Sequence, residues 1–294
     1  AGPGSAVSAG LVPFAIGSET LGSIVSPSTR NGITGHRPTF GTVSRYGAMT
    51  LCWSMDKLGP MARSAEDCAL IYEAIRGRDP RDASTVETAF PFEQGRDARE
   101  FRVGYYASAF EEDYENKTAD LKSLEILREI GFDPVPVELP KDLPVDAALL
   151  TLSVEAAAAF DDLTRSGASD QMVRQTRNAW PHVFRTARFV TAVEFLQANR
   201  VRTQIMRRAS EAFRLIDVLV TPTFGGSVLG ITNLTGHPCV CVPNDFGTTV
   251  EGSERRRPGS ISFIGGLYKD AEALHVAHAY QQATDFHRRR PPLH

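Results

Sequence analysis

Short apolar runs, each bounded by glycine, proline or polar residues, recur along the whole chain. Runs of this length predict buried β-strands, and they lie at residues 11–16, 41–47, 101–106, 134–139, 216–221, 238–243 and 260–264. The run at 134–139 contains two prolines, which cannot donate a hydrogen bond to a neighbouring strand. We therefore expect that strand at an edge of its sheet.

Longer amphipathic segments lie between these runs and predict helices. An apolar residue recurs every third position within residues 113–130, at Leu121, Leu124, Leu127 and Ile130. Residues 64–67 (Ser-Ala-Glu-Asp) resemble a capping box at the start of a helix that ends near Gly77. Further helices are expected at 6–9, 144–160, 170–178, 192–213 and 270–285.

Strands that alternate with long helices indicate an α/β fold, a sandwich around a mixed, mostly buried sheet. Residues 17–50 are rich in Gly, Ser, Thr and Pro, so we expect turns there. The polar loop at 77–97 does not divide the chain, and residues 1–294 are interpreted as one domain.

Composition narrows the function classes. The 294 residues carry a formal net charge of −3, which gives no long-range attraction for nucleic acid or an anionic membrane. Of the four cysteines, Cys239 and Cys241 alternate in a predicted strand, where we expect them to be small core residues. No apolar run approaches the roughly 20 residues that span a bilayer. The expected location is the cytoplasm.

Candidate chemistry centres on Ser23, which follows Gly22 at a predicted sharp turn. Acyl transfer needs a hydroxyl that attacks a carbonyl carbon and fixed donors for the oxyanion that forms. A serine at the end of a strand, with several backbone N–H groups close by, can supply both. On these residues alone, an ordinary loop serine remains an open alternative.

The surroundings of Ser23 closely resemble the amidase signature over residues 4–63. Four segments carry the resemblance: 9–13 (Ala-Gly-Leu-Val-Pro), 17–24 (Gly-Ser-Glu-Thr-Leu-Gly-Ser-Ile), 35–47 (Gly-His-Arg-Pro-Thr-Phe-Gly-Thr-Val-Ser-Arg-Tyr-Gly) and 54–60 (Ser-Met-Asp-Lys-Leu-Gly-Pro). Segments at 217–223, 233–238 and 279–285 have family counterparts too. The resemblance implies the amidase-signature α/β/α sandwich, here with its N-terminal part missing.

The family uses a triad of a nucleophilic serine, a bridging cis-serine and a lysine. The resemblance places Ser23 on the nucleophile and the backbone amides of Thr20, Leu21 and Gly22 on the oxyanion hole. It places Glu19 on the acidic residue that supports this loop. The bridging serine and the lysine fall upstream of the sequence given. We therefore expect this chain alone to be a fragment without activity.

The implied reaction is hydrolysis of a small-molecule carboxylic amide to an acid and ammonia or an amine, through an acyl-enzyme on Ser23. No metal and no organic cofactor is expected. Ser5 and Ser8 are weak candidates for a bridging serine, because both lie too close to Ser23 along the chain. Leu21 and Val25 depart from the family pattern, which has glycine and often arginine there. We expect the Leu21 side chain to narrow the acyl pocket. Val25 removes a cation, so a carboxylate-bearing substrate is less expected.

Two alternatives stay open. The chain could be the glutamine-hydrolysing A-type subunit of a tRNA-dependent amidotransferase, which shares the signature. Only in that case do we expect a nucleic-acid partner. It could also be a catalytically incomplete fragment. Val25 and a short segment at 223–233 favour a stand-alone amidase. The sequence does not fix the oligomeric state, and a homodimer is left open.

Overall fold

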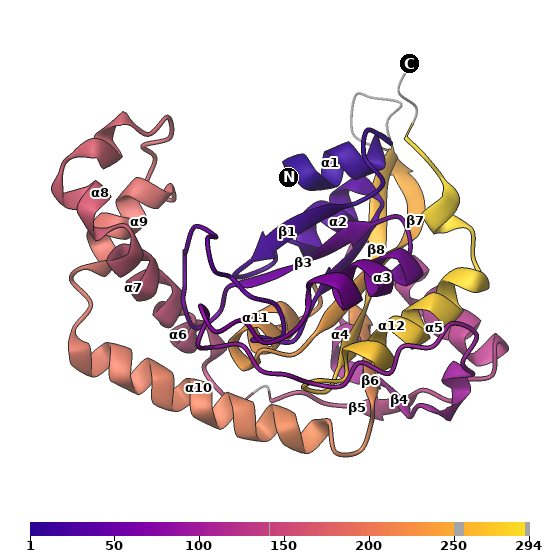
Figure 1. Cartoon of the computed structure of the whole chain (residues 1–294). Coiled ribbons are helices and arrows are strands. Elements are labelled where there is room, and N and C mark those ends of the chain that lie inside the picture. The colour runs from indigo at the N-terminus through magenta and orange to yellow at the C-terminus, as the bar shows by residue number, and fades with distance from the viewer. Residues whose placement is uncertain (141, 250–255, 292–294) are drawn as a thin grey trace.

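A computed structural model describes residues 1–140, 142–249 and 256–291, and a mixed sheet of eight strands crosses this part of the chain (Figure 1). The strands are β1 Ala15–Glu19, β2 Thr34–Arg37, β3 Lys57–Ala62, β4 Val103–Tyr106, β5 Val135–Val137, β6 Val218–Pro222, β7 Cys239–Thr249 and β8 Arg256–Gly265. Their order is β1-β3-β2-β7-β8-β6-β4-β5. β4 runs parallel to β5 and β6, and the other pairs are antiparallel.

Helices cover both faces of the sheet, which confirms the predicted sandwich. They are α1 Gly2–Ser8, α2 Val25–Asn31, α3 Ala65–Ile75, α4 Ala107–Glu111, α5 Lys117–Glu129, α6 Val145–Ala148, α7 Leu150–Ala159, α8 Asp161–Arg165, α9 Trp180–Ala187, α10 Ala192–Ala212, α11 Val228–Thr235 and α12 Asp270–Gln282. Side chains alternate across β7, so Val240 and Val242 pack with α3, α5 and α12 on one face. Cys239 and Cys241 pack with α2, α10 and α11 on the other, as predicted for these thiols.

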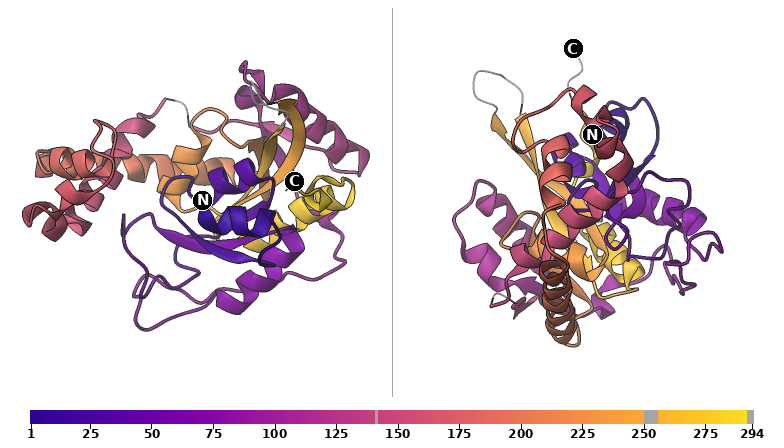
Figure 2. Two further views of the ribbon diagram at one scale, coloured as in Figure 1. Left: turned by 90° about the horizontal axis from the view of Figure 1, so that it is seen from above. Right: turned by 90° about the vertical axis from the view of Figure 1, so that its left-hand side faces the viewer.

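An arm made of α7, α8 and α9 extends to one side of the sheet (Figure 1 and Figure 2). Its helices pack through stacked aromatic rings, with the Phe160 and Phe184 ring centres 4.7 Å apart. The long helix α10 leads from the arm back beneath the sheet. None of the described helices is both long and apolar enough to cross a membrane.

Several predicted elements are confirmed. The Ser64 hydroxyl accepts a hydrogen bond from the backbone N–H of Asp67 at the start of α3. β5 contains one of the two prolines of the predicted run and ends the strand order, so this strand does lie at the edge of the described sheet. The predicted helix at 192–213 is α10, and it begins with a capping box of Thr191 and Glu194.

Other predictions were wrong. The strand predicted at 11–16 starts at Ala15 and runs on through Gly17 to Glu19. Position 17 suits glycine, because a Cβ there would lie only 2.9 Å from the Met61 sulfur. Leu11 is exposed rather than buried. Residues 41–47 form no strand beyond one isolated bridge. No α-helix forms at 170–178, all of which the structure describes. The next helix is α9, which begins at Trp180 and has Pro181 in its first turn, where proline is well tolerated.

Three elements within residues 17–62, α2, β2 and β3, were not predicted. β2 reads Thr-Gly-His-Arg, a sequence without an apolar side chain, yet all four residues are buried. Distant residues pair with most of its buried polar groups, although His36 Nδ1 and Arg37 Nε have no hydrogen-bond partner among the described residues. His36 Nε2 lies 3.1 Å from Asp270 Oδ1, and Arg37 hydrogen bonds to Glu19 and Thr232. A local hydrophobic pattern therefore could not identify this strand.

Candidate active site

Ser23 lies in the turn between β1 and α2, with its side chain exposed. It lines a cavity of about 320 Å³, which we call the serine cavity. Ser18, Thr20 and Ser23 form one side of this cavity, and side chains from residues 45–58 and 81–83 form the rest. The Ser23 hydroxyl makes no hydrogen bond to any other residue that the structure describes, so it is free to meet a ligand.

The backbone on the N-terminal side of Ser23 exposes unpaired donors. The N–H groups of Leu21, Gly22 and Ser23 donate to no other described residue. Gly22 has φ +91°, a left-handed conformation that favours glycine, and a Cβ there would lie 3.0 Å from a Leu229 methyl group. Leu21 does not have positive φ and does not line the serine cavity, so this departure from the family pattern does not narrow it.

Glu19 holds this loop from beneath. Its Oε2 accepts hydrogen bonds from the backbone N–H groups of Ile24 (2.8 Å) and Val25 (2.9 Å). Its Oε1 accepts from Arg37 Nη1 and Asn233 Nδ2, each at 2.9 Å. Burial would raise the pKa of Glu19, but the charge and hydrogen bond of Arg37 outweigh it and lower the pKa to about 2. Glu19 is therefore ionised and fully hydrogen bonded.

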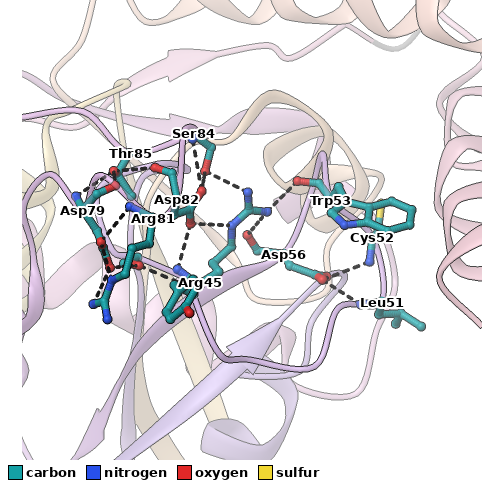
Figure 3. Close-up of polar contacts among 12 residues, drawn as sticks. Arg45, Leu51, Cys52, Trp53, Asp56, Asp79, Arg81, Asp82, Ser84 and Thr85 are labelled. Carbon is teal, nitrogen blue, oxygen red and sulfur yellow. Dashed lines mark hydrogen bonds and ion pairs between the residues drawn. The ribbon is translucent and has the colours of Figure 1, made fainter.

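Asp56 fixes the other side of the loop, a role that the sequence did not reveal although the residue lies in the signature. Thr20 Oγ1 donates to Asp56 Oδ1 at 2.5 Å. Asp56 Oδ2 accepts from the backbone N–H groups of Leu51 (2.8 Å) and Cys52 (2.9 Å) (Figure 3). One carboxylate thus joins the turn that carries Ser23 to the loop at residues 51–52 beside the serine cavity.

The arm and α10 anchor the same loop from outside. Glu155 on α7 accepts hydrogen bonds from the Ser54 backbone N–H (2.9 Å), the Ser54 hydroxyl (2.7 Å) and the Cys52 thiol (3.1 Å). Arg202 on α10 donates to the Ser54 hydroxyl at 2.6 Å and to its carbonyl oxygen at 2.7 Å. Residues distant in sequence therefore set the position of the cavity wall.

Lys57 is buried close to the site but faces away from the cavity. It pairs with Glu19 across β1 and β3, whereas the next pair, Ser18 and Leu58, lines the serine cavity on the opposite face. Its Nζ donates to the carbonyl oxygen of Met55. Burial, with the nearby Arg37 charge, lowers the pKa of Lys57 to about 7.

The remaining candidates lie outside the site. The Ser5 hydroxyl donates to the Gly2 carbonyl oxygen at 3.0 Å, and the Ser8 hydroxyl donates to that of Asn31 at 2.7 Å. Val25 is fully buried in the core. Within residues 1–140, 142–249 and 256–291, no group of three or more His, Cys, Asp or Glu side chains is arranged to hold a metal ion.

Comparison with known proteins places the chain among amidases. The model of the Amidase family matches residues 1–249. The A subunit of glutamyl-tRNA(Gln) amidotransferase from Picosynechococcus is 30% identical over 99% of this chain and 69% of its own length. Its counterpart from Chloroflexus aggregans is 32% identical over 99% and 67%.

Solved structures agree in fold. A peptide amidase from Stenotrophomonas maltophilia superposes with a TM-score of 0.78 and 27% identity, over all of this chain and 66% of its own. The glutamyl-tRNA(Gln) amidotransferase A subunit from Thermotoga maritima gives a TM-score of 0.75 and 27% identity, over 96% and 64%. The chain thus spans about two thirds of the length of these relatives.

Proposed function

The chain belongs to the amidase family, and from that premise we propose that it hydrolyses a carboxylic amide through an acyl-enzyme on Ser23. One observation carries the proposal. An exposed serine hydroxyl stands at the wall of the serine cavity, directly beside three backbone N–H groups that have no acceptor among the described residues. Glu19 and Asp56 hold that loop in place from two sides.

The chemistry follows from these groups. Ser23 Oγ attacks the carbonyl carbon of the amide and loses its proton to a base. The carbonyl oxygen becomes an oxyanion, and we propose that the backbone N–H groups of Leu21, Gly22 and Ser23, with that of Thr20, stabilise it. The C–N bond then breaks, and the nitrogen leaves with a proton as ammonia or an amine. Water hydrolyses the resulting ester to release the acid and restore Ser23.

We propose that the base, a lysine acting through a bridging serine, comes from outside residues 1–294. The Ser23 hydroxyl has no hydrogen-bond partner among the described residues, and Lys57 faces away from it. The 294-residue chain should then show no amide hydrolysis, whereas a protein extended by its upstream coding sequence should show it. Equal turnover by both would contradict this part of the proposal. Residues 1–294 are proposed to act as one domain in either form.

The nucleophile is tested by Ser23→Ala in the extended protein. We expect loss of amide hydrolysis and of covalent labelling by a fluorophosphonate probe, because both need the Ser23 hydroxyl. Ser166→Ala, at an exposed serine after α8, is the matched control and should keep both activities. Undiminished labelling of Ser23→Ala would refute the assignment.

A second candidate is the A-type subunit of a tRNA-dependent amidotransferase, which would hydrolyse glutamine and pass ammonia to a partner. Two relatives described above, at 30% and 32% identity, are A subunits of glutamyl-tRNA(Gln) amidotransferase, which favours this candidate. Co-purification with partner subunits, together with glutamine hydrolysis that depends on them, would support it over a stand-alone amidase. Hydrolysis of simple amides by the protein alone, whether monomer or homodimer, would support the first proposal.

A further inference from the structure

The serine cavity has an apolar, partly aromatic wall. Tyr46, Met49, Leu51, Trp53 and Leu58 all line it. Trp53 is 50% exposed, Tyr46 62% and Met49 85%, so large apolar side chains stand uncovered around one hollow beside Ser23. Such a cluster is typical of a ligand-binding surface, whereas single exposed apolar residues are common anywhere.

Arg45 is the first of two cations in this wall, and its N–H groups already hydrogen bond to other residues of the protein. Its Nε lies 3.4 Å from Asp82 Oδ2, and its Nη2 donates to the Ser84 hydroxyl at 2.8 Å. Its Nη1 donates to the carbonyl oxygens of Trp53 (2.5 Å) and Asp56 (3.3 Å) (Figure 3). Every guanidinium nitrogen therefore has an acceptor, and the side chain is only 17% exposed.

Arg81 is the second cation, and Asp79 neutralises it. Arg81 Nε and Nη2 donate to the two Asp79 oxygens at 2.9 and 3.0 Å, in a bidentate pair. The guanidinium also lies 4.5 Å from the centre of the Tyr46 ring. The hydrogen bonds from Arg81 hold the pKa of Asp79 well below its usual range, so the carboxylate stays charged.

Each cation in the wall already has a carboxylate partner, Arg45 with Asp82 and Arg81 with Asp79. The four charged side chains that line it are Arg45, Arg81, Asp56 and Asp82, two of each sign, and Asp79 adds a further negative charge beside them. A carboxylate that enters loses water without gaining an unpaired cation, which is unfavourable. A neutral ring instead finds Tyr46 and Trp53.

We infer that the serine cavity selects uncharged amides that carry an aromatic or aliphatic group of about one ring, and that it discriminates against amides that carry a carboxylate. The inference rests on the proposed function, because it takes the serine cavity as the place where the substrate binds. The cavity volume of about 320 Å³ lies at the lower end of the range for small-molecule sites, which suits a substrate of this size.

The test measures binding and needs no turnover. The chain contains two tryptophans, so Trp180→Phe leaves Trp53 in the cavity wall as the sole fluorescent tryptophan. The probes are 3-phenylpropanamide and succinamate, which share the amide and two methylene groups and differ in a phenyl ring against a carboxylate. We expect the phenyl compound to quench Trp53 with an affinity about tenfold higher or more. Equal affinities, tighter binding of succinamate, or no binding of either compound overturns the inference.

A second variant reverses the selectivity. Asp79→Asn removes the charge that neutralises Arg81 and should strengthen succinamate binding about fivefold, in a salt-sensitive way, with little effect on 3-phenylpropanamide. Asp97→Asn is the matched control, because Asp97 forms the same bidentate pair with Arg99 outside the cavity. An unchanged succinamate affinity in Asp79→Asn would count against the charge argument.

These binding results are separate from catalysis. Ser23→Ala should keep the preference for 3-phenylpropanamide over succinamate, since we attribute that preference to Tyr46, Trp53 and the paired charges. If Ser23→Ala abolishes hydrolysis but the two probes bind equally, the proposed function stands and the selectivity is wrong. If the probes bind as expected but Ser23→Ala still hydrolyses amides, the selectivity stands and the assigned nucleophile is wrong.

Discussion

Replacing Glu19 with glutamine tests how the loop before α2 is held. Four donors converge on this buried carboxylate, two from the backbone and one each from Arg37 and Asn233. Glutamine has the same shape but only one acceptor oxygen, so its NH₂ group must face one of the donor pairs. Glu19→Gln therefore leaves buried donors unsatisfied and the Arg37 charge without its partner.

Two lines of reasoning give similar magnitudes. A pKa lowered from 4.5 to about 2 corresponds to roughly 3 kcal/mol in favour of the folded carboxylate. Removal of one partner from a buried ion pair typically costs about 3–5 kcal/mol. We therefore expect Glu19→Gln to lower the free energy of unfolding by about 3 kcal/mol or more.

Urea unfolding followed by circular dichroism measures this change at neutral pH. Glu115→Gln is the matched control, because its pair with Arg257 is exposed and 3.5 Å long, and it should change the free energy by less than about 0.5 kcal/mol. A loss below about 1 kcal/mol for Glu19→Gln, or one equal to the control, would refute the role of Glu19 as the support of the loop.

The acid dependence gives a second check. The folded pKa of Glu19 lies below its unfolded value, so its contribution is complete above pH 4.5 and is lost as the pH falls through about 2. The stability difference between the parent and Glu19→Gln should therefore shrink as the pH falls below 4.5. A difference that stays constant from pH 6 to pH 3 would show that the Glu19 charge does not carry the effect.

Three further predictions follow from the same network. The pKa of Lys57 is lowered to about 7, below its unfolded value of 10.5, so the free energy of unfolding should rise between pH 7 and pH 10, and Lys57→Met should flatten that rise in urea titrations. Asp56→Asn should lower kcat of the active protein roughly 10–100-fold with little change in KM, whereas Asp133→Asn on the surface should not. Burial first and the Glu155 charge second raise the pKa of Cys52 to about 12, and all four thiols are buried, so Ellman's reagent at pH 8 should detect none before unfolding and four after.

The proposed nucleophile, Ser23, could be picked out from the sequence because the signature is contiguous around it. Sequence reasoning also found elements with strong local patterns, such as the capped helix α3 and the proline-bearing strand β5. These features depend on neighbours in the chain, which a sequence displays directly.

The parts that the sequence hid depend on contacts across the fold. Glu155 and Arg202 lie 101 and 148 residues from the Ser54 groups that they hold, and no periodicity marks them. Most of the residues that line the serine cavity lie in loops, where the hydrophobic pattern does not show which way a side chain points. β2 was missed for a related reason. Arg37 can be buried there because Glu19, Thr232 and the carbonyl oxygen of His237 accept its hydrogen bonds, and the local sequence does not show these partners.

The position of β1 has a consequence for local unfolding. Of the strands that the structure describes, β1 pairs only with β3, from Ala15 opposite Met61 to Glu19 opposite Lys57. It can therefore separate from the sheet locally, with loss of the Glu19 hydrogen bonds to Arg37 and Asn233, and its amide protons should exchange with deuterium through that opening. The protection of the β1 amides then measures how firmly the segment that leads to Ser23 is held, independently of the global stability of the protein.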